Sequence, residues 1–195
     1  MSGWARYAVH PHKPEAATML SDDDVTWLET PQRDWSRLRL PHMVLADSFV
    51  SGDSTGHRLS LRYFRHDPDR SLRAKVLFGR GTQGPPGHAH GGSMAAVLDE
   101  AMGGAAWMQG DPVVAAELTI RFKTMLPLGA RCVVEAWVSG VAGRKVSVAG
   151  RLTRSDGDTV YAEGEALFIT LDPKKFGVLA SEASRIFSEV DGITS

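Results

Sequence analysis

The chain has 195 residues, of which 43% are hydrophobic and 23% are charged, and its formal net charge is -1. This size and composition fit one folded domain with terminal extensions. Lys and Arg number 22 against 23 Asp and Glu, so no excess of positive charge is available to hold a nucleic acid. The single cysteine, Cys132, has no partner for an internal disulfide, and the first ten residues lack the apolar run of a signal peptide. We therefore expect a cytoplasmic protein with no membrane span.

The first 44 residues are expected to form an N-terminal arm. They contain four prolines and one helical candidate, which begins near Ser21 because Ser-Asp-Asp-Asp can cap the apolar residues that follow. Strand-like runs over 58–65 and 71–79 are separated by the turn-forming sequence His-Asp-Pro-Asp. These two runs predict a hairpin.

A long apolar helix is predicted over about 90–108, since Gly110 and Pro112 form a stop signal. A helix that is apolar nearly all round should be buried on most sides, as it is when a curved antiparallel sheet wraps it. After the helix, alternating polar and apolar residues predict a meander of four antiparallel strands, at 114–123, 131–141, 145–153 and 159–171. The fold class is therefore α+β, and 173–195 is expected to form a C-terminal tail with a short helix.

The segment from Pro85 to Trp107 is the strongest candidate for chemistry. It places one acid, Asp99, within an otherwise apolar helix whose start contains Gly91 and Gly92. A buried carboxylate is costly, so an acid at this place favours a functional role. The start of a helix offers unpaired N–H groups and a partial positive charge, which can stabilise a developing oxyanion.

The sequence His90-Gly91-Gly92, with Asp99 nine residues after the histidine, resembles the helix start of hot-dog-fold thioesterases of the PaaI-like group. Residues 47–53 and 59–63 look like the strand region that leads into that fold. Residues 117–128 look like the family's central strand with its basic end. The resemblance covers a domain over 45–172, leaves the arm at 1–44 and the tail outside it, and implies a hot-dog fold.

The resemblance also implies an activity and a division of roles. In that family the backbone N–H of the glycine after the histidine holds the thioester carbonyl, and the acid of the helix attacks it or activates water. Carried over, Gly91 and the adjoining N–H of Gly92 would polarise an acyl-CoA thioester, with Asp99 as nucleophile or general base. Glu100 is kept as an alternative acid, and His90 is expected to orient the loop or the substrate.

Coenzyme A would enter as part of the substrate, and no further cofactor is expected. His88 and His90 have no third ligand nearby, so they are a weak signal for a metal. Basic residues could meet the coenzyme A phosphates, and the family's basic positions favour Lys123, Arg144 and Lys145 among them. The remaining candidates for substrate contact are Arg80 and Arg121 as further cations, and Trp107 as a wall of the acyl pocket.

Ala115 is a departure from the family pattern, because many members carry a Ser or Thr there that helps to position water. An alanine side chain cannot do this. Glu117 and Thr119 share a strand face with Ala115 because residues alternate along a strand. Either of them takes that role, or water is held in a different way, or the activity is weak.

The spacing of the two main candidates predicts a dimer. Gly91 and Asp99 are eight residues apart, which is about 12 Å along one helix at about 1.5 Å per residue. A nucleophile must come within about 3 to 3.5 Å of the carbon whose oxygen the N–H groups hold. We therefore expect the two groups of one site to come from different subunits of a twofold homodimer, as the resemblance also implies, with a tetramer possible from two such dimers.

Two alternatives remain open at this stage. A hot-dog hydratase or dehydratase would use the same fold, but the chain has neither the Asp-x-x-Pro-x-His nor the His-Phe-Pro stretch that such enzymes resemble. A non-catalytic protein that binds acyl thioesters for regulation is favoured by Ala115 and by the arm outside the resemblance.

Overall fold

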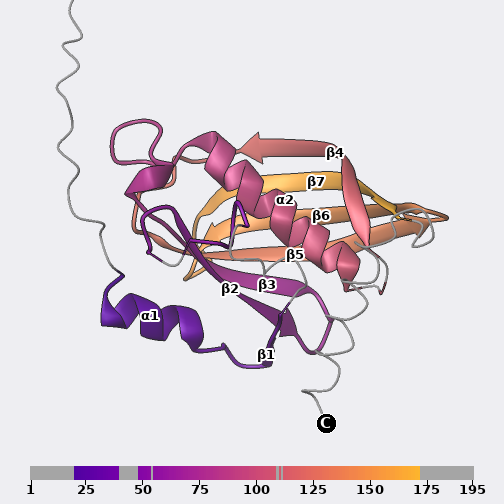
Figure 1. Cartoon of the computed structure of the whole chain (residues 1–195), viewed down its shortest axis with the longest axis horizontal. Coiled ribbons are helices and arrows are strands. Elements are labelled where there is room, and N and C mark those ends of the chain that lie inside the picture. The colour runs from indigo at the N-terminus through magenta and orange to yellow at the C-terminus, as the bar shows by residue number, and fades with distance from the viewer. Residues whose placement is uncertain (1–19, 40–47, 54, 109, 111, 172–195) are drawn as a thin grey trace, which may run out of the picture.

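The computed structural model describes residues 20–39, 48–53, 55–108, 110 and 112–171, and it consists mainly of one long helix lying against a seven-stranded antiparallel sheet (Figure 1). This confirms the predicted α+β class. The elements in chain order are α1 (Asp22–Glu29), β1 (Trp35–Arg37), β2 (Leu59–His66), β3 (Leu72–Phe78), the 3-10 turn η2 (Arg80–Thr82), α2 (Gly91–Trp107), β4 (Val113–Phe122), β5 (Arg131–Ala142), β6 (Lys145–Arg154) and β7 (Val160–Thr170). Among the described helices, none is both long and apolar enough to cross a membrane.

The strand order in the sheet is β1-β2-β3-β5-β6-β7-β4. The predicted hairpin is confirmed as β2 and β3, and β5, β6 and β7 follow one another as a meander. The expectation that β4 begins this meander is wrong, because β4 pairs with β7 at the far edge of the sheet. Strand β5 instead pairs with β3, which leaves β4 no neighbour in the middle of the sheet. The alternation of polar and apolar residues indicates a strand but does not determine which strand it pairs with.

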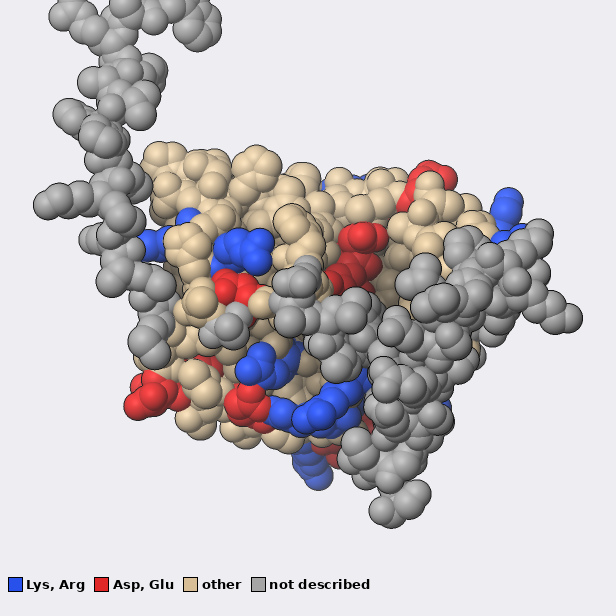
Figure 2. All heavy atoms as spheres, viewed as in Figure 1, with Lys and Arg blue, Asp and Glu red and all other residues tan. Residues whose placement is uncertain are grey.

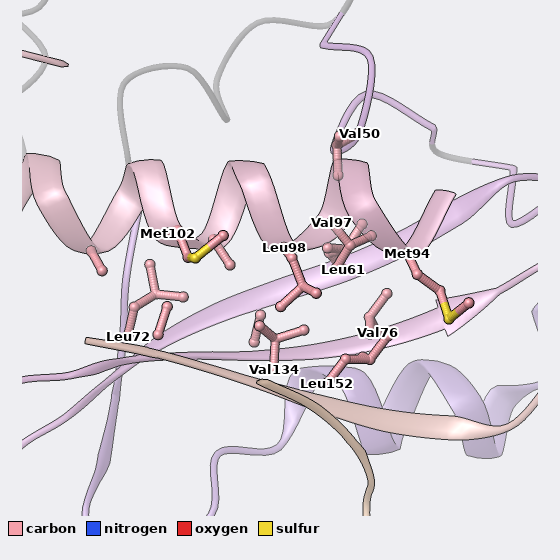
Figure 3. Packing of buried hydrophobic residues seen from close by; sticks show 14 of the residues in the cluster. Val50, Leu61, Leu72, Val76, Met94, Val97, Leu98, Met102, Val134 and Leu152 are labelled. Carbon is pink, nitrogen blue, oxygen red and sulfur yellow. The ribbon is translucent and has the colours of Figure 1, made fainter. Parts of the chain in front are cut away.

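Helix α2 packs its apolar side chains against the inner face of the sheet (Figure 3). Met94, Val97, Leu98 and Met102 are almost fully buried there. Two glycines of the sheet allow the close approach of Met102: a Cβ on Gly150 would lie 3.1 Å from Met102 Cγ, and a Cβ on Gly164 would lie 2.9 Å from Met102 Cε. This packing fixes the helix against β6 and β7, and with it the positions of the candidate site residues.

The described part of the predicted arm, residues 20–39, packs on the outer face and edge of the sheet (Figure 1). Helix α1 begins as predicted after Ser21, whose hydroxyl accepts a hydrogen bond from the Asp24 N–H. The buried Lys75 ammonium of β3 donates to the carbonyl oxygens of Trp27 at 2.7 Å and Thr30 at 2.6 Å, which holds the C-terminal end of α1. The short strand β1, which the sequence did not predict, adds to β2. The predicted tail helix lies outside the described residues.

Candidate active site

The start of α2 presents one backbone N–H that is free to bind a ligand. His90 is the N-cap, and its Nδ1 accepts a hydrogen bond of 2.9 Å from the Gly92 N–H. Neutral His90 therefore carries its proton on Nε2, because a nitrogen that accepts this bond is unprotonated. The Gly91 N–H has no acceptor in the part of the chain that the structure describes. Of the two predicted oxyanion donors, Gly91 is therefore available, whereas Gly92 is already used by the cap.

A hollow of about 270 Å³ lies beside this N–H. A Cβ on Gly91 would lie 3.2 Å from Phe122 Cζ, so the missing side chain leaves room between the helix start and the end of β4. Lys123 reaches the same hollow and forms an ion pair with Glu163 at 2.8 Å. The lining residues are Pro85, His88, Ala89, Gly91, Met94, Phe122, Lys123, Thr124 and Met125.

Asp99 lies in a second, larger cavity of about 460 Å³ further along α2. Its walls are mostly apolar and are formed by Phe49, Val50, Ala96, Asp99, Glu100, Gly103, Trp107, Val113, Ala115 and Phe168. Trp107 closes one end, where its indole N–H donates to the Val113 carbonyl oxygen at 3.2 Å. In Figure 2, acidic side chains are visible over the middle of α2 among uncharged neighbours. The structure thus brings Asp99, Glu100 and Trp107 together around one cavity. An apolar cavity with a few polar groups in its wall is typical of a site for a small ligand.

The two neighbouring acids differ in their surroundings. Among the described residues, no hydrogen-bond donor reaches the Asp99 carboxylate, whose pKa is raised by burial and then by the charge of Glu100. Glu100 accepts hydrogen bonds from the Tyr63 hydroxyl at 2.5 Å and from the Ser48 hydroxyl at 3.3 Å. Asp99 is therefore free to react, whereas Glu100 is held.

The sequence did not single out Tyr63 or Ser48. Alternation along β2 could have placed Tyr63 on the inner face, and a buried phenol needs a hydrogen-bond partner. No pattern in the sequence connects that phenol to Glu100, which lies 37 residues further along the chain.

A bulge in β4 separates the residues that strict alternation placed on one face. Ala115 pairs with Phe168 and lines the Asp99 cavity, but the register then shifts so that Glu117 pairs with Leu167. Paired residues of adjacent strands point to the same side of a sheet, and one extra residue reverses the side that follows. Glu117 and Thr119 therefore lie on the outer face, away from Asp99. The expectation that either shares a face with Ala115 is wrong.

The basic candidates do not converge within one chain. Arg121 pairs with Glu165 at 3.2 Å on the outer face of the sheet, and Lys123 lies at the Gly91 end of β4. Arg144 and Lys145 lie at the turn before β6, where the Arg144 guanidinium donates to the Thr170 carbonyl oxygen at 2.9 Å. Thr170 pairs with Val113, so this turn lies at the opposite end of β4. Arg80 lies in η2 and lines a different hollow from the one that Lys123 reaches.

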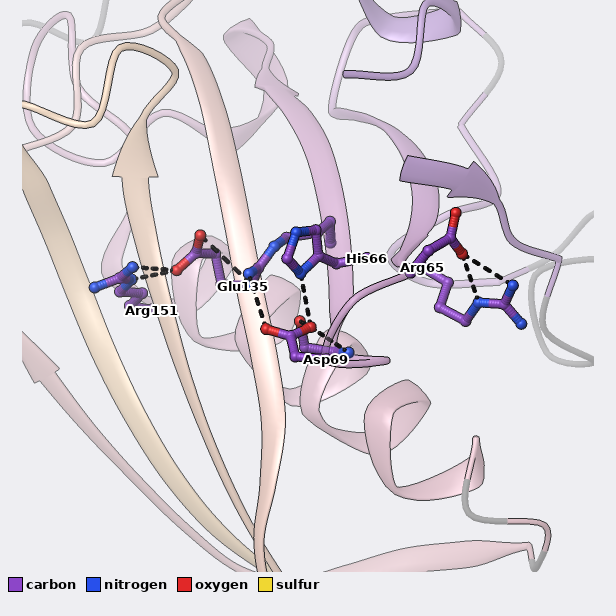
Figure 4. Close-up of polar contacts among 8 residues, drawn as sticks. Arg65, His66, Asp69, Glu135 and Arg151 are labelled. Carbon is purple, nitrogen blue, oxygen red and sulfur yellow. Dashed lines mark hydrogen bonds and ion pairs between the residues drawn. The ribbon is translucent and has the colours of Figure 1, made fainter. Parts of the chain in front are cut away.

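The outer face of the sheet carries charges that neutralise one another. Arg73, Glu135, Arg151, Glu163 and Arg121 follow in register across β3, β5, β6, β7 and β4 with alternating sign. Figure 4 shows part of this row, with Glu135 beside Arg151, and the nearby pair of His66 and Asp69 at 2.7 Å. Paired cations of this kind contribute little to holding a polyanion. Over the described ranges, no three His, Cys, Asp or Glu side chains gather as a metal site would require.

Comparisons with known proteins identify the family and the fold of the chain. A family model described as the thioesterase superfamily matches residues 86–161. Acyl-coenzyme A thioesterase THEM4 of Mus musculus is 38% identical over 172 residues, which cover 88% of this chain and 71% of that protein. Zebrafish thioesterase superfamily member 2 aligns with a TM-score of 0.56 and 17% identity, over 67% of this chain and 93% of that one. The E. coli PaaI protein aligns with a TM-score of 0.53 and 16% identity, over 57% and 80%. The two structures confirm the hot-dog fold.

Proposed function

The chain belongs to the thioesterase superfamily, and we propose that it hydrolyses the thioester of an acyl-coenzyme A to a free acid and coenzyme A. The observation that carries this proposal is the pairing on α2 of a free backbone N–H at Gly91 with an acid that has no hydrogen-bond donor, Asp99. Each group faces its own cavity. One group can polarise a carbonyl, and the other can attack it or take a proton from water.

The two groups of one site come from two subunits of a homodimer. On the 17-residue helix α2, Gly91 and Asp99 are about 12 Å apart. Their cavities lie toward opposite ends of β4, whose outer edge pairs with no described strand. Three apolar side chains of β4 are exposed there, with exposed fractions of 48% for Val114, 38% for Leu118 and 53% for Phe122. A twofold contact along β4 would bury these side chains and bring each Gly91 end to the partner's Asp99 end.

The same twofold contact would gather the cations for the substrate. Lys123 lies at one end of β4, and the turn of Arg144 and Lys145 lies at the other. Antiparallel pairing would place Lys123 of one subunit near the partner's turn. Phosphate groups of coenzyme A are suitable ligands for such a set.

The chemical steps follow from these positions. The carbonyl oxygen of the thioester accepts a hydrogen bond from the Gly91 N–H, which stabilises the negative charge that develops on that oxygen. Asp99 either attacks the carbonyl carbon or removes a proton from an attacking water. The C–S bond then breaks and releases the thiolate of coenzyme A. If Asp99 has attacked the carbon, a water molecule hydrolyses the resulting anhydride, which releases the acid, restores the carboxylate and supplies the proton that the thiolate takes up. If Asp99 has taken a proton from water, the acid is formed directly and that proton passes to the thiolate. His90 orients the helix start through its bond with Gly92, and Trp107 closes the acyl end of the cavity.

Hydrolysis assays over short, long and aromatic acyl-coenzyme A substrates test this proposal. The Asp99→Asn variant should lose about 10²- to 10⁴-fold in kcat, the range for a general acid–base group. Asp156→Asn is a matched control, because it also removes one negative charge but lies in the β6–β7 turn beside Arg154. Full turnover by Asp99→Asn would contradict the mechanism.

One observation favours a second function, that of a non-catalytic protein that binds acyl thioesters. Ala115 lines the cavity beside Asp99 and offers no hydroxyl to a water molecule. Tight binding of acyl-coenzyme A by the wild-type chain, without turnover of any substrate in the series, would identify this function instead.

A further inference from the structure

Glu100 is a half-buried acid held by a group of hydroxyls outside the residues of the proposed reaction. Tyr63 Oη donates to Glu100 Oε1 at 2.5 Å, and Ser48 Oγ donates to Oε2 at 3.3 Å. Ser51 Oγ donates in turn to Ser48 Oγ at 2.8 Å. The donors come from β2 and from the loop before it, so the fold, and not a local sequence motif, assembles this group. Both carboxylate oxygens are occupied, which fixes the orientation of the acid.

Tyr63 can act only as a donor here. Its side chain is buried, and burial together with the negative charge of Glu100 raises the pKa of the phenol well above its usual value. A phenolate beside a carboxylate in a low-dielectric site would be strongly disfavoured. The hydroxyl therefore keeps its proton and donates a hydrogen bond to the ionised carboxylate of Glu100.

The hydroxyls favour the charged form of Glu100. Burial raises the pKa of Glu100, and the hydrogen bonds from Tyr63, Ser51 and Ser48 lower it. No Lys or Arg within the described ranges is among the groups that act on this carboxyl. The adjacent Asp99 has no such donors, and its pKa is raised by burial and by the charge of Glu100. The pKa of both acids is raised, but only that of Glu100 is partly offset by hydrogen bonds, and the negative charge of Glu100 acts on Asp99.

We propose that Glu100 is a positioning residue of the reaction, whose negative charge, held by Tyr63 and Ser48, makes Asp99 a better proton acceptor. The inference rests on the proposed function, because it assigns Asp99 the reacting carboxylate. Glu100 lines the same cavity as Asp99, but in this role it neither attacks the substrate nor takes a proton from water. Tyr63 acts one step further away, by keeping Glu100 ionised and in place.

The dependence of kcat/KM on pH tests this role directly. The acidic limb of that profile reports the pKa of the essential base in the free enzyme. Replacing Glu100 by Gln removes the neighbouring charge and lowers the pKa of Asp99. We therefore expect the acidic limb of Glu100→Gln to move to lower pH by about one unit, while the plateau of kcat falls about 3- to 10-fold because Asp99 is a weaker base.

Tyr63→Phe gives a second and independent reading. Without the hydroxyl, one of the interactions that lower the pKa of Glu100 is lost, so that pKa rises further and the carboxyl carries less negative charge at a given pH. The acidic limb should move in the same direction as in Glu100→Gln. The double variant should match Glu100→Gln alone, because both changes remove the same charge. Glu100→Asp should recover part of the wild-type profile.

The result that overturns the inference is an acidic limb that stays in place in Glu100→Gln while kcat falls in parallel with thermal stability. Additive losses in the double variant would also overturn it. Asp156→Asn controls for the loss of one charge and should leave the limb unchanged. These outcomes are distinct from failure of the proposed function, in which Asp99→Asn keeps its activity or the wild-type chain has none.

Discussion

Gly91 and Phe122 lie in contact across the helix start and the end of β4, since a Cβ on Gly91 would lie 3.2 Å from Phe122 Cζ. This contact allows the N–H of Gly91 to be tested separately from the space beside it. Proline at the first position of a helix is well tolerated, because its missing N–H has no partner within the helix. His90 has φ -67° and ψ 140°, which is the conformation that a following proline requires.

We therefore expect Gly91→Pro to fold and to lose about 10²- to 10³-fold in kcat, as removal of one oxyanion donor does. Gly91→Ala is the matched variant, because it adds the same Cβ beside Phe122 but keeps the N–H. It should lose far less. Equal losses in the two variants, measured by steady-state kinetics, would assign the effect to crowding and would remove the N–H from the mechanism.

Ala115 and Thr119 allow a test of the bulge in β4. Ala115→Ser places a hydroxyl in the Asp99 cavity, where it can hold a water molecule, so we expect kcat to rise several-fold. Thr119→Ala removes a hydroxyl from the outer face and should leave kcat unchanged. A large loss in Thr119→Ala with no effect of Ala115→Ser would contradict this assignment of faces.

The bulge also shows where prediction from the sequence stops. The alternation of polar and apolar residues correctly indicated a strand over 114–123, but it did not predict the register shift between Ala115 and Glu117. That shift depends on how β4 meets β7, a pairing between segments about 50 residues apart. Hydrophobic patterns describe which residues are buried, whereas the pairing of strands is set by long-range packing.

Helix α2 was predictable because the signals that define it are local in the sequence. Its start, its end and its apolar side chains are all encoded within about 20 consecutive residues, and the structure places it at Gly91–Trp107. The resemblance carried by His90, Gly91, Gly92 and Asp99 is confirmed by the family match. The link from Tyr63 to Glu100 was not predictable, because it joins a strand and a helix that only the folded chain brings together.

Lys75 tests whether α1 is an integral part of the fold. Its ammonium donates to the Trp27 and Thr30 carbonyl oxygens and lies 4.9 Å from the centre of the Trp27 ring. Lys75→Met fills a similar volume but leaves both carbonyls without this donor. We expect the free energy of unfolding in urea to fall by about 1 to 3 kcal/mol. Arg33→Met, on the exposed connection before β1, is the control and should change it by less than about 0.5 kcal/mol.

A mixture of two defective chains tests whether one site draws on two subunits. Gly91→Pro supplies an intact Asp99, and Asp99→Asn supplies an intact Gly91 N–H. Each homodimer should be inactive, because both of its sites lack one group. In a mixed dimer of twofold symmetry, one of the two sites combines the intact groups and the other lacks both.

Random exchange of equal amounts gives one half mixed dimers, so the mixture should recover about one quarter of the wild-type activity. Unfolding the two variants together and refolding them ensures exchange, and distinct affinity tags measure the mixed fraction. Refolding each variant alone gives the baseline. Mixed dimers that form in this proportion and remain inactive would place both groups of each site within one chain. The helix start would then have to move to close the distance of about 12 Å that separates the two groups along α2.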